Sequence, residues 1–254
     1  MIIALILKLL FGSVEDAALV FSVSKIEKEI RHHVADDSRK DALLLIVKDS
    51  KKELKEFNKE KKRILKKLNK ISKHREITSK SFLEVFDEYL SARVNMISSL
   101  IDYRLAFQQQ ITEPELTLII KKASTITEKE SRKNSKREEK ADEKLTRIFQ
   151  DINRIVVKNI EDINKREIIM ESINEFEKTI LIFADEVQEM TDERIKLLSN
   201  INASREELSE LYVKNNQLHY KVYRDYAQTR DIIIENTNDK EWKAIYKELK
   251  VFLK

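Results

Sequence analysis

The residues that could bind a metal or transfer protons are few in this chain, and they are scattered. Glu29 and His32 have the Glu-x-x-His spacing that a di-iron helical bundle uses. Such a site needs a second pair of this kind and two further glutamates. Neither His74 nor His219 has an acidic residue three positions earlier. The pattern therefore predicts no metal site.

The chain also lacks the residues on which most catalytic loops depend. It contains one glycine, Gly12, one proline, Pro114, and no cysteine. Nucleotide-binding loops and the turn that exposes a catalytic serine need glycine, and thiol catalysis and thiolate zinc sites need cysteine. We therefore predict a protein that is not an enzyme and carries no cofactor.

Basic residues form the densest group of chemically similar side chains. Residues 51–75 contain twelve Lys and Arg and three Glu, a net charge of +9, whereas residues 151–210 contain eight Lys and Arg and fifteen Asp and Glu, a net charge of −7. The two regions either neutralise each other, within the fold or across a dimer, or leave a basic surface for a membrane or a nucleic acid. The predicted basic surface consists of Lys51, Lys52, Lys55, Lys59, Lys62, Arg63, Lys66, Lys67, Lys70 and Lys73.

An apolar run begins the chain. Residues 2–11 are apolar except for Lys8. A helix that crosses a bilayer needs about twenty apolar residues, so this run is too short to span one. It either packs against the bundle, inserts shallowly at a membrane interface, or is a degenerate signal peptide that lacks a basic start and a clear cleavage site. The predicted membrane contacts are Ile2, Ile3, Leu5, Ile6, Leu7, Leu9, Leu10 and Phe11.

The longest regular pattern lies in residues 169–201. Apolar residues recur there at alternating steps of four and three for nearly five heptads, and Arg194 is the one polar member. Such a seam is typical of a helix that packs lengthwise on another long helix. We predict self-association through this seam, with Arg194 either extending out of it or pairing with an acidic residue that fixes the register. The seam consists of Ile169, Ile173, Phe176, Ile180, Phe183, Val187, Met190, Arg194, Leu197 and Ile201.

Four tyrosines in the following segment could stack on nucleic-acid bases. At helical spacing, however, such aromatic side chains are more typical of core or boundary packing. We therefore interpret them as packing residues. They are Tyr212, Tyr220, Tyr223 and Tyr226.

Periodicity and capping residues predict where the helices begin and end. A helix is expected from about residue 37 to residue 73, and a five-residue connection favours an antiparallel hairpin with a helix that restarts at Thr78 or Ser79. Pro114 indicates a further start. The apolar stripe resumes in residues 145–163 and is expected to lead into the seam helix. Ser204 and Glu207 fit a capping box after a break at 200–203, and a short amphipathic helix is expected after Thr237.

These elements together predict an all-α fold, an elongated bundle of long antiparallel helices with coiled-coil segments. The scarcity of glycine argues against sheets and tight hairpins. We divide the chain into an apolar segment (1–12), a helical hairpin region (13–123), a polar solvated helix or linker (124–144) and a coiled-coil region with an amphipathic C-terminal helix (145–254).

In helix length and charge layout this architecture is similar in outline to membrane-curving helical proteins of the BAR and ESCRT-III types. The first hypothesis is a non-enzymatic scaffold that self-associates and contacts an anionic membrane. An α-helical pore-forming toxin with a sheltered apolar N-terminus is the second. A soluble adaptor or nucleic-acid-associated subunit of a larger complex is the third, with nucleic acid less favoured as a partner than a membrane. We expect a cytoplasmic location, peripheral at the membrane, with secretion as the alternative that a signal peptide would imply.

Overall fold

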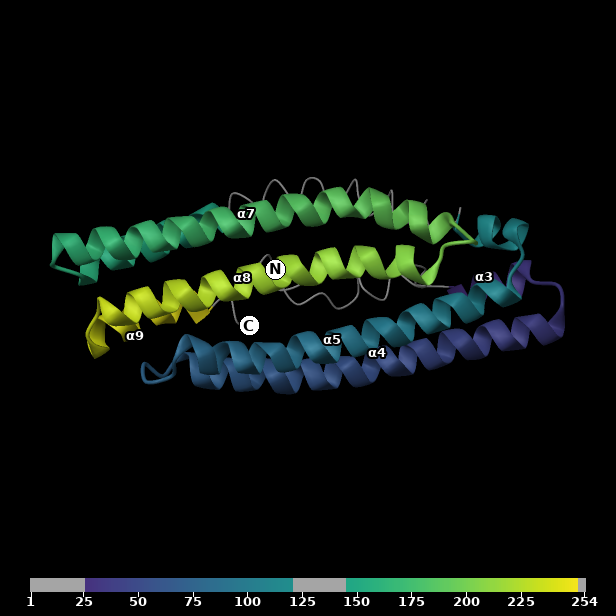
Figure 1. Cartoon of the computed structure of the whole chain (residues 1–254), viewed down its shortest axis with the longest axis horizontal. Coiled ribbons are helices and arrows are strands. Elements are labelled where there is room, and N and C mark those ends of the chain that lie inside the picture. Colours follow the sequence, from purple (N-terminus) through teal and green to yellow (C-terminus); the bar gives the residue numbers. More distant parts are fainter. Residues whose placement is uncertain (1–25, 121–144, 251–254) are drawn as a thin grey trace.

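The computed structural model describes residues 26–120 and 145–250, apart from several side chains between residues 188 and 199, and the described chain is helical without any strand. The all-α prediction is confirmed, and Figure 1 shows long helices lying side by side in an elongated bundle. Two helical stretches without labels cover residues 113–120 and 145–159. The labelled helices are α3 (Ile26–His33), α4 (Asp37–Ser72), α5 (Ser79–Gln110), α7 (Ile163–Ser199), α8 (Arg205–Glu235) and α9 (Asp239–Leu249).

Most helix boundaries lie where the sequence placed them, because side chains cap the free N–H groups at the helix starts. The Thr78 hydroxyl accepts a hydrogen bond from the Ser81 N–H at 3.2 Å and begins α5. Ser204 and Glu207 form the expected capping box of α8. Asn238 forms a second capping box, with Glu241, that starts α9. The predicted breaks before these three helices are confirmed.

One helix boundary was not predicted. Residues 145–163 do not run directly into the seam helix, because the helix at 145–159 ends and α7 starts only at Ile163. The Asp162 side chain accepts a hydrogen bond from the Lys165 N–H at 3.1 Å and caps α7. The Arg166 guanidinium donates to the Ile160 carbonyl oxygen at 2.8 Å and satisfies an acceptor at the end of the preceding helix. The apolar stripe continues across this turn, so the sequence pattern gives no sign that the helix is interrupted.

The four longest helices pack in antiparallel pairs (Figure 1). The turn after Ser72 folds α5 back along α4. Contacts between α5 and α8 join Ser79 to Asp231 at one end and Asp102 to Arg205 at the other, so these two helices run in opposite directions. Helix α7 returns along α8, and α4 and α7 lie at opposite edges of the layer in Figure 1.

One hydrophobic core runs through most of this bundle. It joins buried side chains of α4, α5, the helix at 145–159, α7, α8 and α9. Phe86 of α5 stacks on Tyr223 of α8 with ring centroids 3.6 Å apart, and Phe176 of α7 meets Tyr226 of α8 edge to face. A second cluster around Ile30, Leu43 and Phe107 packs α3 and the first part of α4 against the end of α5 and the helix at 113–120. Helices from both sides of the undescribed segment 121–144 thus share one interior.

Candidate functional site

Eight lysines form a straight row along the exposed side of α4, the last of them at its C-cap residue Lys73. Successive lysines are three or four residues apart, so at about 100° per residue they fall within an arc of about 80° on the helix surface. All eight are exposed. At about 1.5 Å per residue the row is about 38 Å long. We call this row the lysine face; it consists of Lys48, Lys52, Lys55, Lys59, Lys62, Lys66, Lys70 and Lys73.

The lysine face lies directly opposite the buried side of the same helix. Phe57, Ile64 and Leu68 of α4 are 5%, 0% and 0% exposed and belong to the main core. Helical periodicity puts them about 180° around the axis from the lysines. Burial of this apolar stripe therefore fixes the rotation of α4 and directs the lysine face away from the bundle.

Basic residues beside the lysine face are neutralised by neighbouring acids. Lys51 pairs with Glu27 of α3 at 2.8 Å on one side of the face. On the other side, Arg63 pairs with Glu88 of α5 at 3.5 Å, and Lys67 pairs with the same carboxylate. These three basic residues therefore pair with acids of neighbouring helices, and their part in the predicted basic surface stays a prediction.

Within the lysine face the charges are largely unpaired. Lys59 pairs with Glu56 at 2.8 Å, and hydrogen bonding from this lysine lowers the pKa of the Glu56 carboxyl. Over the part of the chain that the structure describes, the other seven lysines form no ion pair. Six residues of the predicted basic surface are thus free of ion pairs within the described chain. One further lysine, which was not in the predicted surface, belongs to the same row. The six are Lys52, Lys55, Lys62, Lys66, Lys70 and Lys73, and the added residue is Lys48.

Polar contacts hold the start of α4 against the rest of the bundle. The Asp36 carboxylate caps α4 by accepting from the Arg39 N–H at 2.7 Å. The Arg39 guanidinium donates to both carboxylate oxygens of Glu115 at 2.8 and 2.9 Å, and the Thr112 N–H donates to the same carboxylate at 2.9 Å. These hydrogen bonds, chiefly from Arg39, lower the pKa of Glu115 to about 2.

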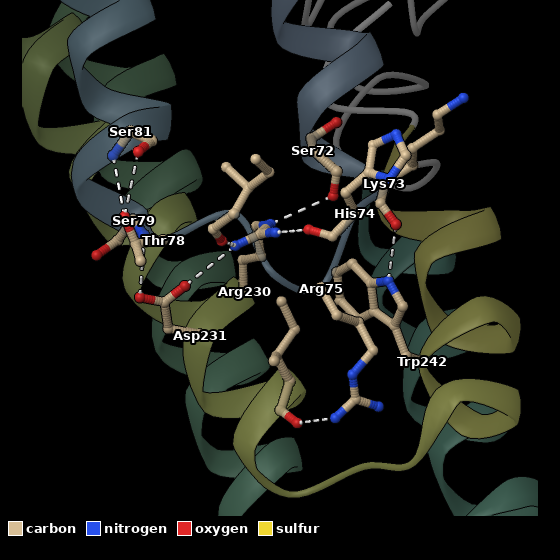
Figure 2. A network of polar contacts seen from close by, with 12 residues as sticks. Ser72, Lys73, His74, Arg75, Thr78, Ser79, Ser81, Arg230, Asp231 and Trp242 are labelled. Atoms are coloured by element: carbon tan, nitrogen blue, oxygen red, sulfur yellow. Dashed lines mark hydrogen bonds and ion pairs between the residues drawn. The ribbon is translucent and has the colours of Figure 1, made fainter.

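Arg230 of α8 fixes the other end of α4 (Figure 2). Its side chain is fully buried and donates to three carbonyl oxygens of the α4–α5 turn, those of Ser72 at 3.2 Å, Ile77 at 2.7 Å and His74. It also pairs with Asp231, whose carboxylate accepts from the Ser79 N–H at the start of α5. One guanidinium therefore binds carbonyl oxygens along the length of the turn. Burial lowers the pKa of this guanidinium.

Helix α9 completes this clamp from the C-terminal side. The Trp242 indole N–H donates to the Lys73 carbonyl oxygen at 3.1 Å, and the Arg230 guanidinium lies 5.6 Å from the Trp242 ring centroid. The Tyr246 hydroxyl meets the Ser72 hydroxyl at 2.8 Å. In return, Arg75 of the turn donates to the Ile234 carbonyl oxygen at the end of α8, at 2.7 Å (Figure 2). Lys73, the last residue of the lysine face, is thus anchored through its own backbone.

The heptad seam lies inside the chain. Its first seven members, from Ile169 to Met190, are at most 8% exposed and pack in the main core. Thr179, beside the seam, donates to Asp225 of α8 at 2.8 Å. The side chain of Arg194 lies outside the described part. The seam therefore packs α7 within its own chain, and self-association through it would require α7 to leave the bundle; that interaction stays a prediction.

Acidic residues cover the outer side of α7. Helical spacing puts them opposite the seam, and they are exposed. Since α4 and α7 lie at opposite edges of the molecule (Figure 1), the lysine face and these acidic residues lie apart within the described fold. The exposed acids are Glu167, Glu171, Glu175, Asp185, Glu189 and Glu193.

The remaining predicted features are placed as follows. Tyr212, Tyr223 and Tyr226 are buried, which confirms them as packing residues, whereas Tyr220 is 42% exposed. No three His, Asp or Glu side chains among the described residues are grouped to hold a metal ion. No described helix is long and apolar enough to cross a bilayer. Residues 2–11 and 124–144 lie outside the described ranges.

Comparison with known proteins gives no further guide to function. No protein-family model, curated protein or solved structure matches this chain. The lysine face is consequently the feature with the most definite chemistry: a linear array of exposed cations on one long helix.

Proposed function

We propose that this protein is a non-enzymatic, elongated helical scaffold that docks on an anionic membrane surface through the lysine face of α4. The observation that carries the proposal is the straight row of eight exposed lysines, seven of them without an ion pair within the described chain. A straight row of charges can meet a planar surface along its full length. The bundle behind it gives the array a fixed shape, as docking in one orientation requires.

The expected strength of this interaction is useful but reversible. A lysine near an anionic leaflet contributes about 1 kcal/mol. Eight lysines would together contribute about 8 kcal/mol, which corresponds to a dissociation constant near 1 µM. Because the Debye length shrinks to about 3 Å in 1 M salt, the interaction would fade as salt is added.

The composition of the face favours lipid over nucleic acid. It contains lysine alone, whereas planar recognition of phosphates and stacking on bases favour arginine. No aromatic residue occupies a position in the row, and single-stranded nucleic acids are usually held by aromatic stacking. A duplex also presents its phosphates on a curved, winding path, which a straight row meets only at intervals.

The N-terminal segment would add a second, salt-resistant contact. The described chain begins at Ile26, and the next residue, Glu27, pairs with Lys51 beside the lysine face. The described chain therefore begins beside the proposed docking surface. Stable membrane binding commonly combines a weak apolar anchor with a polybasic patch.

Flotation with liposomes tests the proposal. The full-length protein should float with anionic vesicles at low salt, float less at high salt, and float weakly with neutral vesicles. Deletion of residues 2–11 should reduce the fraction that floats at high salt, and unchanged binding would remove this segment from the membrane contact. Absence of flotation in every condition would overturn the membrane proposal.

Two other functions give different results in the same samples. An α-helical pore-forming toxin would release an encapsulated dye and form ring-shaped oligomers. A nucleic-acid-associated subunit would bind DNA or RNA with a steep salt dependence without floating.

A second copy of the chain is a competing partner, favoured by the acidic residues on the outer side of α7. The lysine face of one copy meeting α7 of the next would generate an open, side-by-side array. Exposed ion pairs contribute about 0–1 kcal/mol each, so we expect the membrane to compete successfully for the lysines. Sedimentation of the protein without lipid at low salt would reveal such an array.

A further inference from the structure

We propose that the lysine face recognises the density of negative charge on a lipid surface and not the structure of any one headgroup. This inference rests on the proposed membrane docking and specifies which property of the membrane the docking surface recognises. It predicts that phosphatidylserine and a phosphoinositide are interchangeable at equal surface charge.

The shape of the site carries the first part of the argument. The lysines project from the outer side of one helix, so they form a convex ridge. Neighbours in the row are about 5–6 Å apart at their Cβ atoms, and their side chains diverge from the helix axis. A pocket described in the structure lies elsewhere, between α7 and α8, lined by residues that include Leu197 and Leu211. Specific recognition of a headgroup needs donors that converge on it, and a convex ridge holds them apart.

The chemistry of lysine carries the second part. Its ammonium is a compact charge on a flexible stem, and it imposes no fixed bidentate geometry on a phosphate or carboxylate. Arg63, the arginine nearest to the row along the helix, is held by Glu60 at 2.6 Å and by Glu88. The ridge therefore offers exchangeable cations, each of which can pair with whichever anionic group lies beneath it.

Equal and independent contacts give the inference a quantitative form. At about 1 kcal/mol for each lysine, loss of one lysine weakens binding about fivefold, and loss of two weakens it about thirtyfold. Position along the row should not matter. The double variants K52Q/K55Q and K66Q/K70Q lie in different halves of α4 and should lose affinity by the same factor. When the two are combined, these factors should multiply.

The experiment compares these variants on two sets of vesicles matched for surface charge. One set contains phosphatidylserine, and the other contains phosphatidylinositol bisphosphate at a lower mole fraction. Glutamine is a good helix former, so the substitutions preserve α4. K165Q/K221Q removes two exposed lysines from α7 and α8 and serves as the matched control, which should bind like the unaltered protein.

The outcomes separate this inference from the proposed function. Equal affinity for both sets of vesicles, together with equal losses of affinity in the two double variants, would support recognition of surface charge density. A tenfold preference for one headgroup at matched charge, or a loss confined to one double variant, would overturn the inference while leaving membrane docking intact. Failure of the unaltered protein to bind either set would overturn the docking itself.

Discussion

Replacement of Arg230 by methionine should destabilise the protein by about 3–4 kcal/mol. The buried guanidinium donates to the carbonyl oxygens of Ser72, His74 and Ile77. A hydrogen bond from a charged donor contributes about 1.5–3 kcal/mol, but water can reach the turn once the clamp opens, so we assign about 1 kcal/mol to each carbonyl. Loss of the contact with the Trp242 ring adds about 0.5–1 kcal/mol.

Urea unfolding followed by far-UV circular dichroism measures this loss. The matched control is Arg224→Met on the same helix, because that side chain is about half exposed and, among the described residues, pairs with the adjacent Asp225 alone. The control should change the free energy of unfolding by less than about 0.5 kcal/mol. Amide exchange should also quicken in residues 73–78 of the Arg230 variant. A loss below about 1 kcal/mol would refute the reasoning that the turn depends on this guanidinium.

Three further perturbations have definite expected outcomes. The pKa of Glu115 is lowered from 4.5 to about 2 in the folded chain, so its stabilising effect is present above pH 4.5 and is lost as the pH falls toward 2. The free energy of unfolding should therefore fall by up to about 3 kcal/mol over this pH range, and Glu115→Gln should abolish that fall. Asp162→Ala removes the cap of α7 and should cost about 1 kcal/mol in urea unfolding. Trp242→Phe retains an aromatic ring but removes the hydrogen bond to the Lys73 carbonyl, and should cost about 1 kcal/mol while increasing amide exchange at the end of α4.

Local sequence signals predicted the helices and most of their ends because the physical causes are local. A capping side chain and the N–H it satisfies lie within three residues of each other, as in Ser204 and Glu207. The break before Ile163 escaped prediction because the apolar periodicity continues through it. The signal that could have located it was Asp162, a good capping residue within an otherwise uninterrupted stripe.

The candidate site was only partly predictable, because pairing depends on helices distant in sequence. The sequence located the basic segment, but the partners of Lys51 and Lys67, Glu27 and Glu88, come from other helices. The clamp by Arg230 was invisible for the same reason, since its acceptors are backbone carbonyls more than 150 residues away. Likewise, a heptad seam indicates that a helix packs against a long partner helix. It does not indicate whether that partner belongs to the same chain.

The lysine face should itself destabilise the protein, and this gives a test that separates function from folding. Neighbouring lysines three or four residues apart repel each other by about 0.2–0.5 kcal/mol per pair. The variant K52Q/K55Q/K66Q/K70Q removes six of the seven such pairs in the row. It should therefore be more stable than the unaltered protein by about 1–3 kcal/mol in urea unfolding at low salt, and this gain should shrink at high salt.

The same variant should bind anionic vesicles far more weakly. A protein that becomes more stable while losing its membrane affinity cannot have lost that affinity through unfolding. An ordinary solvated helix face usually alternates its charges. In α4, by contrast, the buried side and the two anchored ends hold a row of like charges in place, as a docking surface requires. Unchanged or lower stability of the quadruple variant at low salt would contradict the repulsion and would remove this reason for regarding the row as a functional surface.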